Sequence, residues 1–191
     1  KKYLSKTTLS TEGENAIQRP VGYYIINQDS IFVFDMNRNK LVLIDKQGRK
    51  LDESSLINNE SSTDGNWTLK YPFFYPQTVT GMIRKNNDLI LTGSYTWAIP
   101  EEIMDSFKFT AVYNIKNKEV QHYHTYPKSV FGSEFNWDDP FYTTVYYDWN
   151  ENEQKMVYSF PVSSSLFTGI LQNDSAIKEV STANDLVSAK P

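Results

Sequence analysis

Two histidines come closest to recognisable chemistry in this sequence, because they are its only imidazoles and lie two residues apart. His122 and His124 flank Tyr123, and side chains that alternate along an extended strand would place both rings on one face. Such a pair can bind zinc or copper once a third ligand is supplied, and Glu134 and Asp138 are the candidate carboxylates. The simpler interpretation is a polar outer strand that faces water, so we expect no metal site.

A larger set of aromatic and acidic residues falls in three long loops, at residues 58–78, 95–108 and 128–142. We expect these loops to share one rim of the fold, where aromatic faces could stack on sugar rings or grip a peptide. The alternative is that the aromatics pack between sheets and under the loops. The predicted binding residues are Trp67, Tyr71, Trp97, Glu101, Glu102, Glu134, Trp137, Asp138 and Asp139, and the further aromatic members of the rim are Phe73, Phe74, Tyr75, Phe135 and Phe141.

The segment after Tyr95 has the strongest helical features of the chain. Pro100 suits a first helical turn, and Glu101 and Glu102 suit the positive end of a helix. Apolar residues follow at helical spacing, namely Ile103, Met104 and Phe107. We expect a short helix that plugs a gap between sheets, or alternatively acts as a lid or docks a partner.

Other motifs predict no catalytic residue and no cofactor. Asp148 to Glu153 begins like a calcium loop, but Glu153 occupies the glycine position and Ser159 the position of the bidentate acid, which favours a polar hairpin turn. The hydroxyls of Ser163 to Ser165 lack a nucleophile elbow, and both histidines lie on one strand, so no nucleophilic triad is indicated. We found no glycine-rich phosphate loop.

Composition favours an all-β fold and excludes several partners. The 191 residues are 39% hydrophobic and 15% aromatic, with 13 Tyr and 11 Phe, a balance that suits half-buried strands. The net charge is −4 and no basic cluster occurs, so nucleic acid is not an expected partner. No apolar run approaches the roughly 18 residues that span a bilayer. The chain has no cysteine, which excludes disulfides but indicates no compartment.

The strands repeat in three units of about 60 residues, which is typical of β-propeller blades. The first strands of the units are centred near Tyr24, Ile83 and Val145, and three further short strands follow each. We therefore predict an all-β propeller domain over residues 1–191, with three four-stranded blades at about 20–57, 78–127 and 142–183. A β-sandwich is the alternative, but it needs no repeated unit.

The run from Asp29 to Gly48, with Arg19 and Pro20 before it, resembles blades of TolB-like and NHL-like six-bladed propellers. More closely, the chain resembles a family of bacterial six-bladed propeller lipoproteins known chiefly as a domain of unknown function. This resemblance implies a propeller fold and a lipid-anchored protein of the periplasm or cell surface. It carries no catalytic residues to this sequence.

Three blades do not close a ring, since they leave two open flanks with exposed apolar faces. We expect half of a six-bladed propeller, completed by further sequence or by a second copy. The expected function is a non-enzymatic binding or scaffold module of the bacterial cell envelope, which presents its rim to a protein, peptide or glycan. The alternatives are a glycan-active hydrolase or lyase that uses rim carboxylates, and a purely structural repeat.

Overall fold

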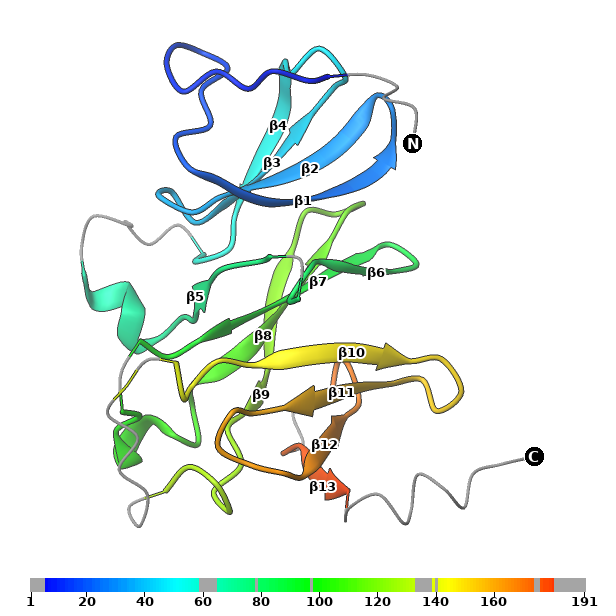
Figure 1. Cartoon of the computed structure of the whole chain (residues 1–191). Coiled ribbons are helices and arrows are strands. Elements are labelled where there is room, and N and C mark those ends of the chain that lie inside the picture. The colour runs from blue at the N-terminus through cyan, green and yellow to red at the C-terminus, as the bar shows by residue number, and fades with distance from the viewer. Residues whose placement is uncertain are drawn as a thin grey trace.

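The chain forms three antiparallel sheets and almost no helix (Figure 1). The computed structural model describes residues 6–58, 65–77, 79–96, 98–132, 139, 141–173 and 176–180. The first and third sheets have four strands each and the second has five. The prediction of an all-β fold is therefore confirmed, and the described sheets number three, not the two of a sandwich. No ring closure is seen among the described residues.

The first sheet is a meander with strand order β1-β2-β3-β4. Its strands are β1 (Pro20–Asn27), β2 (Ser30–Asp35), β3 (Lys40–Ile44) and β4 (Lys50–Ser55). Tight turns connect them, and the turn between β2 and β3 uses Asn39 with φ 51°, a left-handed conformation that asparagine tolerates. All four strands were predicted.

The second sheet has a first strand that is interrupted. Its elements are β5 (Phe73–Phe74), β6 (Ile83–Lys85), β7 (Asp88–Ser94), β8 (Lys108–Asn114) and β9 (Val120–Thr125). Both β5 and β6 pair with β7, Phe74 opposite Gly93 and Ile83 opposite Ile90. The described intervening residues, 75–77 and 79–82, therefore lie outside the sheet, an excursion that the sequence analysis did not predict.

The third sheet has the order β10-β11-β12-β13. Its strands are β10 (Tyr146–Asn150), β11 (Lys155–Ser159), β12 (Leu166–Gly169) and β13 (Lys178–Val180). The side-chain oxygen of Asn150 accepts the backbone N–H groups of Asn152 and Glu153, which closes the turn between β10 and β11. The prediction of a polar hairpin turn here is confirmed.

The sheets are stacked in chain order, with the second between the other two (Figure 1). One apolar cluster joins the first and second sheets and contains Phe32, Phe34, Leu89 and Leu91. Another joins the second and third sheets and is built around Phe109, Tyr158 and Phe160. The outer face of the first sheet carries a small cluster in which Val33 and Val42 pack under Ile17 of the N-terminal segment.

The two described helices are short 3-10 turns, η1 (Gly65–Leu69) and η2 (Glu101–Ile103). Pro100 precedes η2, and Met104 and Phe107 behind it are buried in the cluster between the second and third sheets. The predicted short helix is thus present in a shorter form. In the described part of the chain no helix has the length and apolarity needed to cross a membrane.

Candidate functional site

Two adjoining cavities run along the first strands of the three sheets. The larger, about 570 Å³, lies between β1 and residues 75–82, and the smaller, about 240 Å³, lies between that segment and the start of the third sheet. Both have Tyr75 and Gln77 in their walls. We call the pair the inner-strand groove; its walls are formed by Pro20, Val21, Gly22, Tyr23, Phe73, Tyr75, Pro76, Gln77, Val79, Thr80, Gly81, Met82, Thr92, Gly93, Ser94, Phe141, Thr144, Val145 and Tyr146.

The described residues between β5 and β6, 75–77 and 79–82, are braced by hydrogen bonds within the segment and by one from the third sheet. Thr80 donates from its hydroxyl to the Tyr75 carbonyl at 3.3 Å, and the Gln77 N–H donates to the Thr80 hydroxyl at 3.3 Å. Tyr147 of the third sheet donates to the Gly81 carbonyl at 2.7 Å. Burial raises the pKa of Tyr147, which therefore stays a neutral donor. The groove wall is accordingly preorganised.

One sequence signal for this segment was available. Pro76 has no N–H and cannot donate a hydrogen bond to a neighbouring strand, so a proline at this point argues against a continuous first strand in the second sheet. The excursion leaves Leu91 and Thr92 of β7 opposite the detached segment. Where the first strand resumes, at β6, depends on its pairing with β7, and the proline alone does not predict that position.

Gly22 lets β1 approach the excursion closely. It has φ 89°, and a Cβ on it would lie 2.3 Å from the Pro76 carbonyl oxygen. No side chain fits at that distance, and a left-handed φ is strained for residues other than glycine. The contact brings the first sheet against the second beside the groove.

The groove is aromatic and uncharged. Tyr23, Tyr75 and Phe141 are 67%, 42% and 57% exposed, an unusual exposure for large apolar side chains gathered along neighbouring strands. Gln77, Thr80 and Thr144 add amide and hydroxyl groups. Among the described wall residues there is no carboxylate, ammonium, guanidinium or imidazole group. Such a surface suits a neutral ligand with apolar parts.

The described rim residues from the sequence analysis mostly lie outside this groove. Trp67 on η1 is 7% exposed and its ring stacks on Phe73, with 6.5 Å between centroids. Tyr71 is half-buried against the ring of His122. Glu101 and Glu102 on η2 are exposed, and neither lines a groove cavity. Outside the described residues lie the remaining rim predictions, Trp97, Glu134, Phe135, Trp137 and Asp138.

Asp139 is a predicted site residue that adjoins the groove. Its carboxylate accepts the Phe141 N–H at 2.8 Å, and its carbonyl accepts the Tyr142 N–H at 3.0 Å. The resulting turn carries Phe141 into the wall of the smaller cavity. Asp139 is therefore placed to position an aromatic residue. Whether the rim residues bind a ligand stays a prediction.

The two histidines do not share a face, which corrects the expectation from strand alternation. His124 has φ 62°, so the regular alternation of β9 fails at this residue. His122 packs against Tyr71 and Phe74 and reaches the backbone of Leu56, which follows β4 of the first sheet. His124 packs toward the third, where its ring meets the Tyr158 hydroxyl. Neither is a water-facing residue: His124 is 2% exposed and His122 is largely buried.

The environments of the two imidazoles also differ. The ring of His122 hydrogen-bonds to the backbone of Leu56, and its Nε2 is buried without a partner. Burial lowers the pKa of His122 to about 4. His124 donates from Nε2 to the Ile170 carbonyl at 3.1 Å and accepts the Tyr158 hydroxyl at Nδ1 at 2.7 Å. In the described residues no group of three or more metal-ligating side chains occurs.

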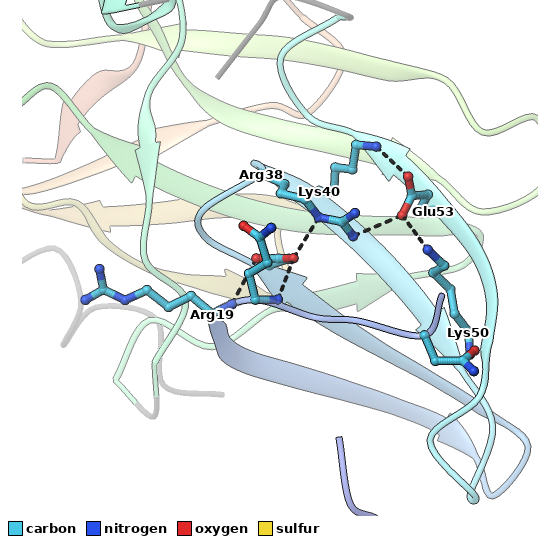
Figure 2. A network of polar contacts seen from close by, with 8 residues as sticks. Arg19, Arg38, Lys40, Lys50 and Glu53 are labelled. Atoms are coloured by element: carbon cyan, nitrogen blue, oxygen red, sulfur yellow. Dashed lines mark hydrogen bonds and ion pairs between the residues drawn. The ribbon is translucent and has the colours of Figure 1, made fainter. Parts of the chain in front are cut away.

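An ionic cluster lies on the outer face of the first sheet (Figure 2). Arg38, Lys40 and Lys50 converge on Glu53, and Arg38 also donates to buried Asp35 at 2.9 Å. The hydrogen bond from Lys40 is the main cause that lowers the pKa of Glu53 to about 2, with Lys50 and Arg38 adding to it. The carboxylate of Glu53 is held as an anion by these fixed cations, so the cluster is suited to fastening strands together.

Comparison with known proteins identifies a family and a fold. The family model described as a domain of unknown function, DUF4221, matches residues 1–189. The crystal structure of a DUF4221 family member from Bacteroides vulgatus ATCC 8482 superposes with a TM-score of 0.67 at 18% identity. The match covers 91% of this chain and 46% of that one, so this chain spans about half of its relative's length. No curated protein matches.

Proposed function

We propose that this chain, which belongs to the DUF4221 family, is a non-enzymatic binding module whose inner-strand groove holds an uncharged, extended peptide. The observation that carries this proposal is the groove itself: exposed aromatic rings and neutral polar groups surround two joined cavities without a charged side chain among the described wall residues. A charged ligand would find no counter-charge there.

Unpaired strand edges favour a peptide over a glycan. Among the described residues, β1, β5, β6 and β10 each pair with a single neighbouring strand. An extended peptide can use the free backbone groups of such an edge while its side chains occupy adjacent pockets. Tyr75 and Phe141 would then act as apolar anchors, and Gln77 would hydrogen-bond to the peptide backbone.

Panning a phage-displayed library of short random peptides on the full chain tests this function. We expect enrichment of uncharged peptides with aromatic or aliphatic residues, and we expect Tyr75→Ala to weaken their binding about tenfold or more. Leu69→Ala is the matched control, because Leu69 is exposed on η1 outside both cavities. Enrichment of charged peptides, equal binding by Tyr75→Ala, or binding only to a parallel array of neutral glycans would contradict the proposal.

We further propose that the three sheets are blades of a six-bladed propeller of the bacterial cell envelope. The face-to-face stacking of the sheets supports a propeller, and the share of the Bacteroides relative that is matched supports further blades from additional sequence or a second copy. The lipid anchor and the envelope location rest on the family resemblance. Gel filtration with mass measurement tests the assembly, and a stable 22.1 kDa monomer with no further blades would contradict it.

A further inference from the structure

A separate polar cavity of about 370 Å³ lies where the second and third sheets meet, away from the inner-strand groove. Asp88 at the start of β7, Asn114 at the end of β8 and Gln121 on β9 contribute from the second sheet. Gln172, in the turn after β12, contributes from the third. We call this cavity the polar pocket. Its volume falls in the range of small-molecule sites, about 300 to 1,000 Å³.

The side chains of the polar pocket hold one another in place. The two carboxylate oxygens of Asp88 accept amide N–H groups, one from Asn114 at 2.7 Å and the other from Gln172 at 3.2 Å. Asn117 donates in the same way to Glu119 at 2.7 Å, and the Tyr123 hydroxyl donates to the side-chain oxygen of Gln121. The bond from Gln172 to Asp88 links two sheets, so the pocket is assembled by their packing.

After these bonds are made, the walls of the polar pocket still carry both hydrogen-bond donors and hydrogen-bond acceptors. The carboxylates of Asp88 and Glu119 have acceptor capacity beyond the N–H bonds that the structure shows, and each side-chain amide carries two N–H groups. A hydroxyl group both donates and accepts, so several hydroxyls on one ligand match such a mixture. A metal ion or an amine would leave the amide N–H groups unmatched, and an anion would meet two carboxylates with no cation among the described wall residues.

The same pocket offers a small apolar surface. Val112 and Tyr123 line it and are 5% and 8% exposed, so their apolar atoms form part of a buried floor. A sugar ring presents hydroxyls at its edge and C–H groups on its face, and such a floor is suited to the latter.

We propose that the polar pocket is a binding site for a single neutral sugar ring, distinct from the peptide groove proposed above. Asp88 and Glu119 accept from the sugar hydroxyls, and the amides of Gln121 and Gln172 donate to them. The site goes beyond the proposed function and stands whether or not the groove binds peptides, since the described walls of the two share no residue.

Ligand-observed saturation-transfer NMR on the full chain tests this site. The probes are free neutral hexoses and N-acetylhexosamines, with uronic acids, spermidine and calcium chloride as charged comparators, the last followed by shift changes of the protein. We expect saturation transfer to at least one neutral sugar, and about tenfold weaker binding of it by Gln121→Ala and by Asp88→Asn, which corresponds to one good hydrogen bond or slightly more. Gln47→Ala is the matched control, an exposed glutamine in a turn of the first sheet.

The outcomes separate this site from the groove. Tyr75→Ala should leave the sugar signal unchanged, and loss of the signal in that variant would place the sugar in the groove and overturn the proposal. It would also be overturned if no neutral sugar receives saturation, if Gln121→Ala binds like the wild type, or if only spermidine, calcium or uronic acids bind. Because Gln121 is exposed, its replacement should leave the fold intact, and thermal unfolding checks this.

Discussion

The two junctions between sheets are built differently. The junction of the first and second sheets is mainly apolar, and its described polar links include the Ser54 to Tyr113 hydrogen bond, the Lys118 to Asp52 ion pair and the bond from the His122 ring to the backbone of Leu56. The junction of the second and third sheets adds buried hydrogen bonds to an aromatic cluster, including those from Tyr158 to His124 and between Tyr158 and Thr110. Apolar burial has no direction, whereas buried hydrogen bonds require one geometry. The second junction should therefore fix the orientation of its sheets more strictly.

The histidines show the same contrast on a single strand. His122, at the apolar junction, keeps a buried nitrogen without a partner, whereas His124, at the hydrogen-bonded junction, has partners for both ring nitrogens. An unsatisfied buried acceptor costs about 1 to 3 kcal/mol. The apolar junction thus contains a weak point that the other lacks.

The largest expected loss of stability comes from removing a buried phenylalanine ring, and it should be similar at both junctions. Phe34→Ala in the first junction and Phe109→Ala in the second each remove a ring with no solvent exposure. Each should lower the free energy of unfolding by about 3 to 5 kcal/mol, because both the transfer energy and the packing are lost. Urea denaturation followed by circular dichroism measures this. A much smaller loss for Phe34→Ala would mean that the first junction is loosely packed.

Acid should weaken the apolar junction first. The pKa of His122 is lowered from 6.5 to about 4 in the folded chain, so the unfolded chain binds more protons between these values. Stability is therefore complete above pH 6.5 and falls by about 3 kcal/mol as the pH approaches 4. His122→Asn retains a donor for the Leu56 carbonyl and should remove most of this pH dependence in urea titrations. Identical pH profiles for the variant and the wild type would contradict the assignment.

Removing one hydroxyl should distinguish the junctions. Tyr158→Phe deletes the group that bridges His124 at 2.7 Å and Thr110 at 3.0 Å, so buried polar atoms lose a partner and about 1 to 3 kcal/mol should be lost. Tyr113→Phe deletes only a partly buried bond to Ser54 and should cost about 1 kcal/mol or less. Equal shifts of the urea midpoint in the two variants would remove the contrast.

The smallest effect belongs to the ionic cluster outside both junctions. The pKa of Glu53 is lowered from 4.5 to about 2, so its stabilisation is present above pH 4.5 and is lost as the pH falls toward 2. Solvent screens this partly exposed cluster, so Glu53→Gln should cost about 1 kcal/mol at neutral pH and nothing near pH 2. Glu14→Gln, on the exposed N-terminal segment, is the control. A pH-independent difference would contradict the ion-pair origin.

Local patterns predicted the elements whose pairing is local. The hairpin of β2 and β3 was expected at Ser30 to Met36 and Lys40 to Asp45 and forms at Ser30–Asp35 and Lys40–Ile44, because two short, continuous apolar runs flank a polar turn. The first strand of the third unit was expected from Thr143 and begins at Tyr146. Thr143 instead bonds through its hydroxyl and carbonyl to Tyr95 and Tyr126, which holds the backbone before the ladder starts.

The candidate site depended on contacts that no local pattern contains. Tyr75 and Phe141 were recognised as aromatic residues in long loops, but Tyr23 and Gln77 join them only because the excursion folds between β1 and β10. The polar pocket likewise needs Gln172 to reach Asp88 across two sheets. The prediction that both histidines share a face was wrong for a related reason. The positive φ of His124 interrupts the alternation of side chains between the two faces of β9.

Gly22 determines how closely the first and second sheets approach each other beside the groove. It lines the larger groove cavity and also a further cavity that Ile25 and Ile31 help to form. Any added side chain would collide with the Pro76 carbonyl, so a single methyl group here would act as a wedge between two sheets. The close approach of β1 to Pro76 beside the groove therefore depends on the missing Cβ of Gly22. Alanine scanning that skips glycines would overlook this position.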